Sequence, residues 1–246
     1  MEKINKMDAV ITNNLSKKYN DKLAVNSLNL TIKKGQLFSL LGTNGAGKTT
    51  TIKMLSTLLL PTYGDGIVYG YDIKKEVQKI KEIINVSPQE TAIASNLTVL
   101  ENLNFMAGIY KIQNKKEKIN ELIKMFRLEE VLKQKAKTLS GGWQRKLSIA
   151  LALINSPQVL FLDEPTLGLD VIARKELWTI IENLKGKITI ILTTHYMEEA
   201  EKLSDMVGIM NKGKLIEVGT VKELTSKTKT KNLEEAFIKL VTGGEE

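Results

Sequence analysis

Cysteine is absent from this sequence of 246 residues, and histidine occurs once, as His195. Without cysteine the chain can form no disulfide scaffold, offers no thiol nucleophile and binds no zinc through sulfur. A single histidine likewise excludes a metal site made of several imidazole ligands. The lack of cysteine fits a reducing compartment.

Long hydrophobic runs are also missing. The longest apolar stretches, such as Val159–Leu162 and Ile188–Leu192, are far shorter than the ~20 residues that a membrane-spanning helix needs. The first ten residues carry charges and no apolar segment long enough for a signal peptide. If this protein acts at a membrane, we therefore expect another chain to supply the membrane part.

Arginine is scarce although the chain is basic. Lysine and arginine total 36 against 28 acidic residues, a net charge of +8, yet only Arg127, Arg145 and Arg174 are arginines. Because base readout and bidentate phosphate recognition favour arginine, a lysine-rich surface does not predict a nucleic-acid partner. Attraction to an anionic membrane surface remains compatible with this charge. A hydrophobic content of 42% predicts a globular chain rather than a disordered one.

Two kinds of apolar pattern predict strands. Alternating patterns predict half-buried antiparallel strands at Ala9–Leu15 and Ala24–Ile32. Short continuous runs suit strands buried on both faces of a mainly parallel sheet. These runs are Leu37–Leu41, Ile83–Val86, Val159–Leu162 and Ile188–Thr193.

Helical patterns fill the segment from about 90 to 156. Thr98 and Glu101 form a capping-box pattern that predicts a helix running toward Tyr110. One apolar stripe at helical spacing follows, made by Ile119, Leu122, Ile123 and Phe126. Near the end, Thr225–Lys231 predicts a solvated linker, Leu233–Val241 an amphipathic helix, and the last four residues a frayed terminus. We therefore expect an α/β sheet with a mostly helical insertion.

A phosphate-binding motif follows the first buried run. Residues 42–49 match G-x-x-x-x-G-K-[ST], between a predicted strand and a helical pattern over Thr50–Leu58. Its glycines let successive N–H groups point at phosphate oxygens, Lys48 would reach the β- and γ-phosphates, and the Thr49 hydroxyl would bind Mg²⁺. The alternative is a glycine-rich turn, but a chance match in such a chain is on the order of 1%. The motif comprises Gly42, Thr43, Asn44, Gly45, Ala46, Gly47, Lys48 and Thr49.

Two acids end the run Val159–Leu162. A buried strand there would deliver Asp163 and Glu164 to the edge of the sheet where ligands bind in α/β folds. Asp163 fits a role in holding Mg²⁺, and Glu164 fits a group that orients or deprotonates the attacking water. Without the phosphate loop, a solvated acidic turn would be the better interpretation.

A second anion-binding helix start is predicted at Ser140, Gly141 and Gly142, ahead of helical spacing over Gln144–Ile154. One nucleotide does not need two such sites from one chain. Leu139–Gly142 resembles the signature sequence of ATP-binding cassette (ABC) ATPases, and the two motifs above are similar to their Walker A and Walker B motifs. The fifth signature position, often Gln in this family, is Trp143.

The resemblance covers essentially the whole chain. It implies a P-loop NTPase (RecA-like) α/β fold with a mostly parallel sheet, an N-terminal antiparallel β subdomain and a helical insertion that carries the signature. It divides the chain into an ATPase domain over residues 1–224, with a helical subdomain at about 90–156, and a linker with a C-terminal helix over 225–246.

The resemblance also implies roles for single residues. Tyr19 would stack on adenine, Thr50 would join the phosphate loop, Gln89 would sense Mg²⁺ and the γ-phosphate, Asp170 would form the D-loop, and His195 would contact the γ-phosphate. Catalysis would then rest on Glu164, His195 and Gln89, and Mg²⁺ on Thr49, Gln89 and Asp163. Taken singly, Tyr19 fits a strand end, Gln89 an ordinary loop and His195 a structural histidine.

The family resemblance implies ATP and Mg²⁺ as cofactors, and pairing with a second copy or another ATPase chain. Two such domains would sandwich ATP between Walker A of one and the signature of the other. It implies a location on the cytoplasmic face of the cell membrane beside a separate polytopic permease, coupled through residues near Gln89–Glu101. Segments at Glu164–Val171, Thr193–Glu201 and Leu233–Lys239 resemble exporter-type ATPases.

Two alternatives remain. DNA-repair and chromosome-organising ATPases of this type carry coiled-coil or zinc insertions, but Thr50–Leu139 contains no heptads and no cysteine. A regulatory ABC ATPase without transport stays open.

Overall fold

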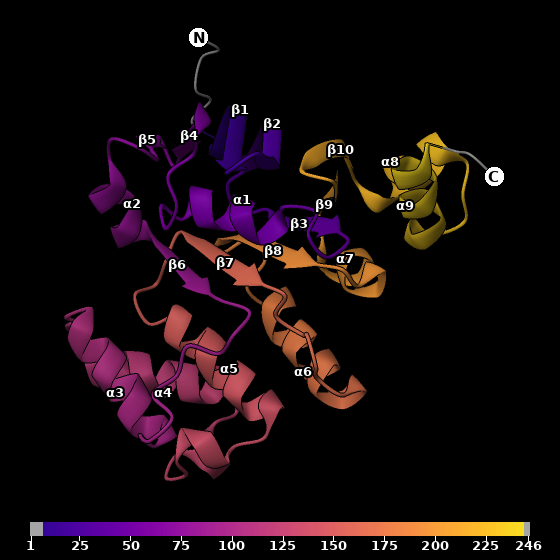
Figure 1. Ribbon diagram of the computed structural model, residues 1–246. Coiled ribbons are helices and arrows are strands. Elements are labelled where there is room, and N and C mark those ends of the chain that lie inside the picture. Colours follow the sequence, from indigo (N-terminus) through magenta and orange to yellow (C-terminus); the bar gives the residue numbers. More distant parts are fainter. Residues whose placement is uncertain (1–6, 244–246) are drawn as a thin grey trace.

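The computed structural model describes residues 7–243 and contains two sheets and a helical layer (Figure 1). The fraying expected at the terminus falls, for residues 244–246, outside the described part. Among residues 7–243, no helix has both the length and the apolar character needed to cross a bilayer.

The larger sheet has the strand order β10-β9-β3-β8-β7-β6, and its four pairings from β9 to β6 are parallel. Every residue of β3, β7 and β8 is buried, which explains why continuous apolar runs predicted them. The predicted mostly parallel sheet is confirmed, although Ile83 ends a helix rather than opening β6. The strand bounds are β3 Leu37–Gly42, β6 Ile84–Ser87, β7 Val159–Asp163, β8 Thr189–Thr194, β9 Met206–Asn211 and β10 Lys214–Gly219.

The smaller sheet is antiparallel, with the order β2-β1-β4-β5. Its strands are β1 Asp8–Tyr19, β2 Lys22–Lys33, β4 Tyr63–Val68 and β5 Tyr71–Asp72. The first two extend beyond the predicted ranges because the register between them shifts at several points, which interrupts the alternation in the sequence.

Helix α1 (Lys48–Leu55) lies between the two sheets (Figure 1). Its Ile52 and Leu55 share one buried cluster with Leu15 of β1 and Phe38 of β3. The helix ends at Leu55, earlier than the predicted Leu58, because Thr57 adopts a left-handed φ of +61°. A short helix, α2 (Val77–Ile83), packs below β5 and leads into β6.

The helical insertion contains α3 (Val99–Ile109), α4 (Lys115–Phe126), two 3₁₀ turns (Glu129–Val131 and Ala136–Thr138) and α5 (Gly141–Ala152). The capping box predicted at Thr98 and Glu101 is present at the start of α3.

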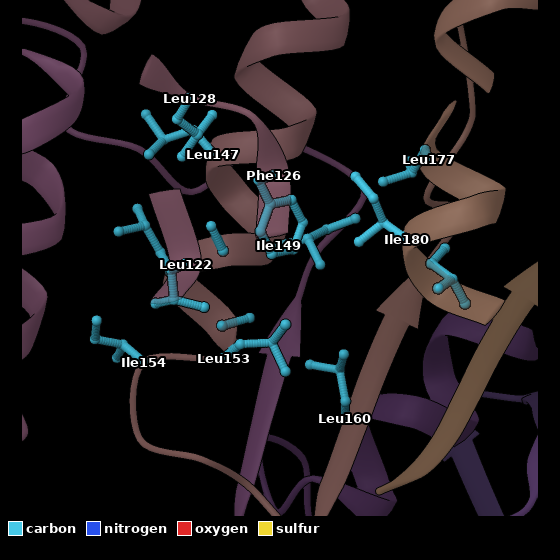
Figure 2. Close-up of a cluster of buried hydrophobic side chains, with 14 of the residues drawn as sticks. Leu122, Phe126, Leu128, Leu147, Ile149, Leu153, Ile154, Leu160, Leu177 and Ile180 are labelled. Carbon is cyan, nitrogen blue, oxygen red and sulfur yellow. The ribbon is translucent and has the colours of Figure 1, made fainter. Parts of the chain in front are cut away.

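The predicted stripe on α4 is buried, and its side chains pack toward α5 and the larger sheet. Figure 2 shows Phe126 beside Ile149 of α5, with Leu160 of β7 and Leu177 of α6 close by. The insertion and the larger sheet therefore share one core, which fixes α5 relative to the strands.

The remaining helices are α6 (Val171–Glu182), α7 (Met197–Leu203), α8 (Val221–Thr228) and α9 (Leu233–Thr242). The linker predicted at Thr225–Lys231 is wrong over its first half, since Thr225 and Thr228 belong to α8. A capping box at Thr220 and Glu223 starts this helix. The hydroxyls of Thr225 and Thr228 donate to backbone carbonyls one turn earlier in the helix. Leu224 of α8 then packs with Phe237 of α9.

Candidate functional site

The phosphate loop joins β3 to α1. At two of its positions the packing is so close that only glycine fits. A Cβ on Gly47 would lie 2.4 Å from the carbonyl oxygen of Ala24, and Gly47 has a φ of +104°. A Cβ on Gly42 would lie 2.5 Å from the carbonyl oxygen of Met210. No side chain caps α1, so its first N–H groups and the positive end of its dipole are open to an anion.

Lys48 places a buried cation inside this loop. Its Nζ donates to the carbonyl oxygens of Gly42 (2.8 Å) and Thr43 (3.2 Å) and lies 3.5 Å from Oε1 of Glu164. Burial lowers the pKa of Lys48, and the neighbouring carboxylate of Glu164 opposes this shift. The result is a desolvated ammonium group whose attraction for phosphate is weakly screened by water.

One oxygen from helix α1 and one from the end of β7 suit a magnesium ion. The Thr49 hydroxyl donates to Oδ1 of Asp163 at 3.1 Å, and the Thr193 hydroxyl donates to the same oxygen. No group of three acidic, histidine or cysteine side chains within residues 7–243 forms a metal cage. Because Mg²⁺ usually takes one or two protein oxygens and completes its shell with phosphates and water, Thr49 and Asp163 fit this ion.

Glu164 lies next to the cation and the histidine. Its Oε1 is 3.3 Å from Nδ1 of His195, a buried ring nitrogen with no hydrogen-bond partner in the described structure. Glu164 has a φ of +46°, an uncommon value for a non-glycine residue. Its N–H is held in this turn by the hydroxyl and carbonyl oxygens of Thr193. The strained turn aims the carboxylate into the site.

A cavity of about 510 Å³ opens over these groups. Of the predicted residues, it is lined by Tyr19, Asn44, Gly45, Ala46, Gly47, Lys48, Thr49, Thr50, Gln89, Glu164 and His195. Gly42 and Thr43 line a neighbouring hollow of about 280 Å³ with Phe237 of α9. Asp163 lies behind Thr49 and does not reach the cavity wall.

The predicted signature residues lie elsewhere. Ser140, Gly141 and Gly142 form the start of α5, and none of them lines the cavity. Ser140 and Gly141 are exposed, and the Ser140 side chain makes no capping bond. Asp170 is also outside the cavity and caps α6 by accepting from the N–H groups of Ile172 and Ala173.

Two functional candidates were missed at the sequence level. Arg145 of α5 is buried and donates to the carbonyl oxygens of Pro88, Gln89 and Glu164. Glu199 of α7 is fully buried, and burial raises its pKa above the usual range for glutamate. In the sequence, Arg145 and Glu199 each lie in a predicted helix that also carries apolar residues, and this was the available signal that they are buried. Nothing in the neighbouring sequence identifies their partners.

Comparisons with known proteins point to one family. The family model described as ABC transporter matches residues 25–167. The chain is 37% identical over 235 residues to the probable multidrug ABC transporter ATP-binding protein YbhF of Escherichia coli, covering 92% of this chain and 40% of that protein. It is 40% identical over 221 residues to the daunorubicin/doxorubicin resistance ATP-binding protein DrrA of Streptomyces peucetius, covering 89% and 67%.

Solved structures share the fold. An ATP-binding subunit of an ABC transporter aligns with a TM-score of 0.85 and 27% identity, covering 94% of this chain and 99% of that one. The dimeric ATP-binding cassette MJ0796, bound to ADP and Pi in a post-hydrolysis state, aligns with a TM-score of 0.78 and 26% identity, covering 86% and 98%. With the family model matching residues 25–167 and these relatives aligned along most of its length, the chain belongs to the ABC transporter family.

Proposed function

We propose that this chain is the ATP-binding and ATP-hydrolysing subunit of an exporter-type ABC transporter. One observation carries the proposal: Oε1 of Glu164 lies 3.5 Å from Nζ of Lys48 and 3.3 Å from Nδ1 of His195 at the wall of a phosphate-loop cavity. A carboxylate beside a phosphate-binding cation is placed to act on water at the γ-phosphate.

In this proposal ATP lies with its phosphates at the start of α1. Lys48 exchanges its bonds to the carbonyls of Gly42 and Thr43 for the β- and γ-phosphates. Tyr19, whose side chain is exposed at the rim of the cavity, stacks on adenine through its ring face. Thr49, Asp163 and Gln89 would hold Mg²⁺, which neutralises phosphate charge.

Glu164 then accepts a proton from a water molecule as the water oxygen attacks the γ-phosphorus. The bond from this phosphorus to the bridging oxygen breaks, and ADP leaves with the bonding electron pair. His195 binds the γ-phosphate beside Glu164 and orients it for attack. Lys48, already desolvated, stabilises the charge on the leaving oxygens.

The exposed start of α5 requires a second molecule for its function. We infer that Ser140, Gly141 and Gly142 contact the nucleotide of a paired chain, a second copy or a different ATPase, because they do not reach the cavity of their own chain. A dimeric relative, MJ0796, supports such pairing. Pairing closes both nucleotide sites, and hydrolysis reopens them.

Transport itself requires a membrane partner, and the chain spans only 40% of the length of its relative YbhF. We propose a separate polytopic permease, with the chain on the cytoplasmic face of the membrane. Exposed apolar side chains on α3, at Leu100, Phe105 and Ile109, support a contact surface there, next to the predicted coupling segment near Gln89–Glu101. The names of YbhF and DrrA support drug-like cargo.

The test is the substitution Glu164→Gln, which keeps the shape of the side chain and removes its basicity. We expect steady-state ATP hydrolysis to fall by about 100- to 10,000-fold, the range for loss of a general base. ATP binding should persist, and dimers should accumulate with Mg²⁺ and ATP in light-scattering measurements.

The matched control is Glu198→Gln, an exposed carboxylate of α7 close in sequence to His195. It should hydrolyse ATP like the wild type. Near-normal turnover in Glu164→Gln would remove Glu164 from the role of base.

Copurification with a polytopic membrane protein separates a transporter from a regulatory ATPase.

A further inference from the structure

Arg145 is a buried cation that has no carboxylate ion-pair partner among residues 7–243. Its side chain is 3% exposed, and within the described part of the chain its guanidinium hydrogen-bonds only to backbone carbonyl oxygens. Nη1 donates to Pro88 at 2.6 Å, and Nη2 donates to Gln89 at 2.9 Å and to Glu164 at 3.0 Å. These charge-assisted bonds satisfy a group that is costly to bury.

The three carbonyls belong to two loops, and Arg145 bonds to both of them. Pro88 and Gln89 follow β6, and Glu164 follows β7. Arg145 comes from α5, whose first turn carries the exposed Ser140 and Gly141. One planar guanidinium therefore joins the loop of Gln89, the loop of Glu164 and the helix that starts with the signature residues.

Arg145 does not itself line the nucleotide cavity, whereas Gln89 and Glu164 do. It therefore acts on the site through the backbone of these two residues. The fork of a guanidinium is rigid, so all three bonds are kept only for one relative placement of the loops and α5. A shift of either loop would carry α5 with it or leave a buried donor unpaired.

We propose that Arg145 is a positioning residue that couples the two ATP sites of the paired assembly. It makes the placement of Ser140 and Gly141, which serve the partner's nucleotide, depend on the placement of Gln89 and Glu164 around this chain's own nucleotide. This inference rests on the proposed function. Coupling of this kind is a free energy shared between two sites and is measurable as cooperativity.

A cation that merely stabilises α5 would not couple the two ATP sites. Lys146, the next residue, provides that comparison: it is 6% exposed, its Nζ lies 2.6 Å from the Glu176 carboxylate, and it lies 4.3 Å from the ring of Trp143. Lys146 joins α5 to α6 and has no hydrogen bond to Gln89 or Glu164. Loss of Lys146 therefore removes a buried cation from the same helix without touching either loop.

The experiment measures the ATP dependence of hydrolysis by wild type, Arg145→Met, Arg145→Lys and Lys146→Met. For two coupled sites we expect a wild-type Hill coefficient approaching about 2, falling to about 1 in both Arg145 variants. ATP affinity of the single chain, measured by titration without hydrolysis, should change by less than about 3-fold. Arg145→Lys keeps the positive charge but lacks the rigid guanidinium fork. If Arg145→Met does not fold, Arg145→Lys therefore tests the coupling on its own.

Lys146→Met should keep the wild-type Hill coefficient. An unchanged Hill coefficient in the folded Arg145 variants, or a wild-type value of about 1, overturns the coupling and leaves the proposed function standing. Equal loss of cooperativity in Lys146→Met also overturns it, because general damage to α5 would then explain the effect. Absence of hydrolysis in the wild type instead overturns the proposed function, and this inference with it.

Discussion

The starts of α1 and α5 are both glycine-rich and both offer backbone donors to an anion, but they are built in opposite ways. At α1, Gly47 is packed so tightly that a Cβ would lie 2.4 Å from a carbonyl oxygen, and Lys48 is pinned by two carbonyls. At α5, a Cβ on Gly141 would meet no heavy atom within 4 Å. Ser140 is exposed and caps nothing.

Under the proposed function, this difference separates the half of the nucleotide site that the chain would complete alone from the half that would need a partner. The start of α1 is enclosed between two sheets and is preorganised for phosphate. The start of α5 is held by residues of its own helix: Gln144 donates to the carbonyl of Ala136, and Arg145 bonds to two loops. A rigid helix with an open first turn is suited to a ligand that a second molecule brings.

The largest expected effect comes from Gly47→Ala compared with Gly141→Ala. The first substitution forces a Cβ into a backbone contact at a φ of +104°, so the loop must distort. We expect it to weaken ATP binding by at least about 100-fold and to destabilise the fold by about 1–3 kcal/mol. Gly141→Ala should leave both quantities within experimental error, as measured by nucleotide titration and urea unfolding.

Equal losses in the two glycine variants would contradict the contrast between a packed and an open helix start. The double variant Gly47→Ala/Gly141→Ala serves as the control. Because the effects of independent sites add, its loss should equal the sum of the losses in the two single variants.

A smaller effect is expected when the side chains rather than the glycines are changed. Lys48→Ala removes the buried cation and should weaken ATP binding to the single chain by about 10- to 100-fold, the cost of one charge-assisted contact. Ser140→Ala should not change this affinity, because Ser140 does not reach the cavity. It should instead reduce ATP-dependent dimerisation, measured by light scattering at increasing protein concentration. Weaker nucleotide binding by isolated Ser140→Ala would place Ser140 in its own chain's site.

The contrast also explains what could be predicted from the sequence. Strands β3, β7 and β8 were predicted because residues buried on both faces leave a continuous apolar run. The phosphate loop was predicted because its glycines obey local backbone constraints that a spacing rule can capture. Whether the role of each site residue is the expected one stays a prediction.

Arg145 and α8 show where sequence patterns fail. A charged residue in a helix normally predicts an exposed face, and the carbonyls that satisfy Arg145 come from loops 56 and 19 residues away in sequence. The Ser, Thr and Lys content of Thr225–Lys231 indicated a linker, but a capping box at Thr220 and burial of Leu224 make most of it helical. Nonlocal contacts decided the case of Arg145, whereas in α8 a local capping box and the packing of Leu224 with Phe237 act together.

The smallest effect is expected from a change at Glu199, which helps to hold the loop that carries Glu164. Glu199 is fully buried in α7, and its Oε1 accepts from the Thr166 hydroxyl (2.8 Å) and the Trp178 indole (3.1 Å). Thr166 follows Glu164 in the chain, so this carboxyl anchors the loop that carries the proposed base. Burial raises the pKa of Glu199, while these donors and the charge of Arg174 oppose the shift.

A raised pKa gives Glu199 a definite pH signature. Above the usual glutamate pKa the unfolded chain releases this proton while the folded chain retains it, so stability falls as the pH rises. Glu199→Gln keeps an acceptor for both donors and cannot ionise. We therefore expect its free energy of unfolding, relative to wild type, to increase between pH 5 and pH 8. Urea unfolding at both pH values measures this, with the exposed Glu198→Gln as a control that should show no such trend. A difference that stays constant with pH would mean that Glu199 is charged in the folded protein and that Arg174 compensates it fully.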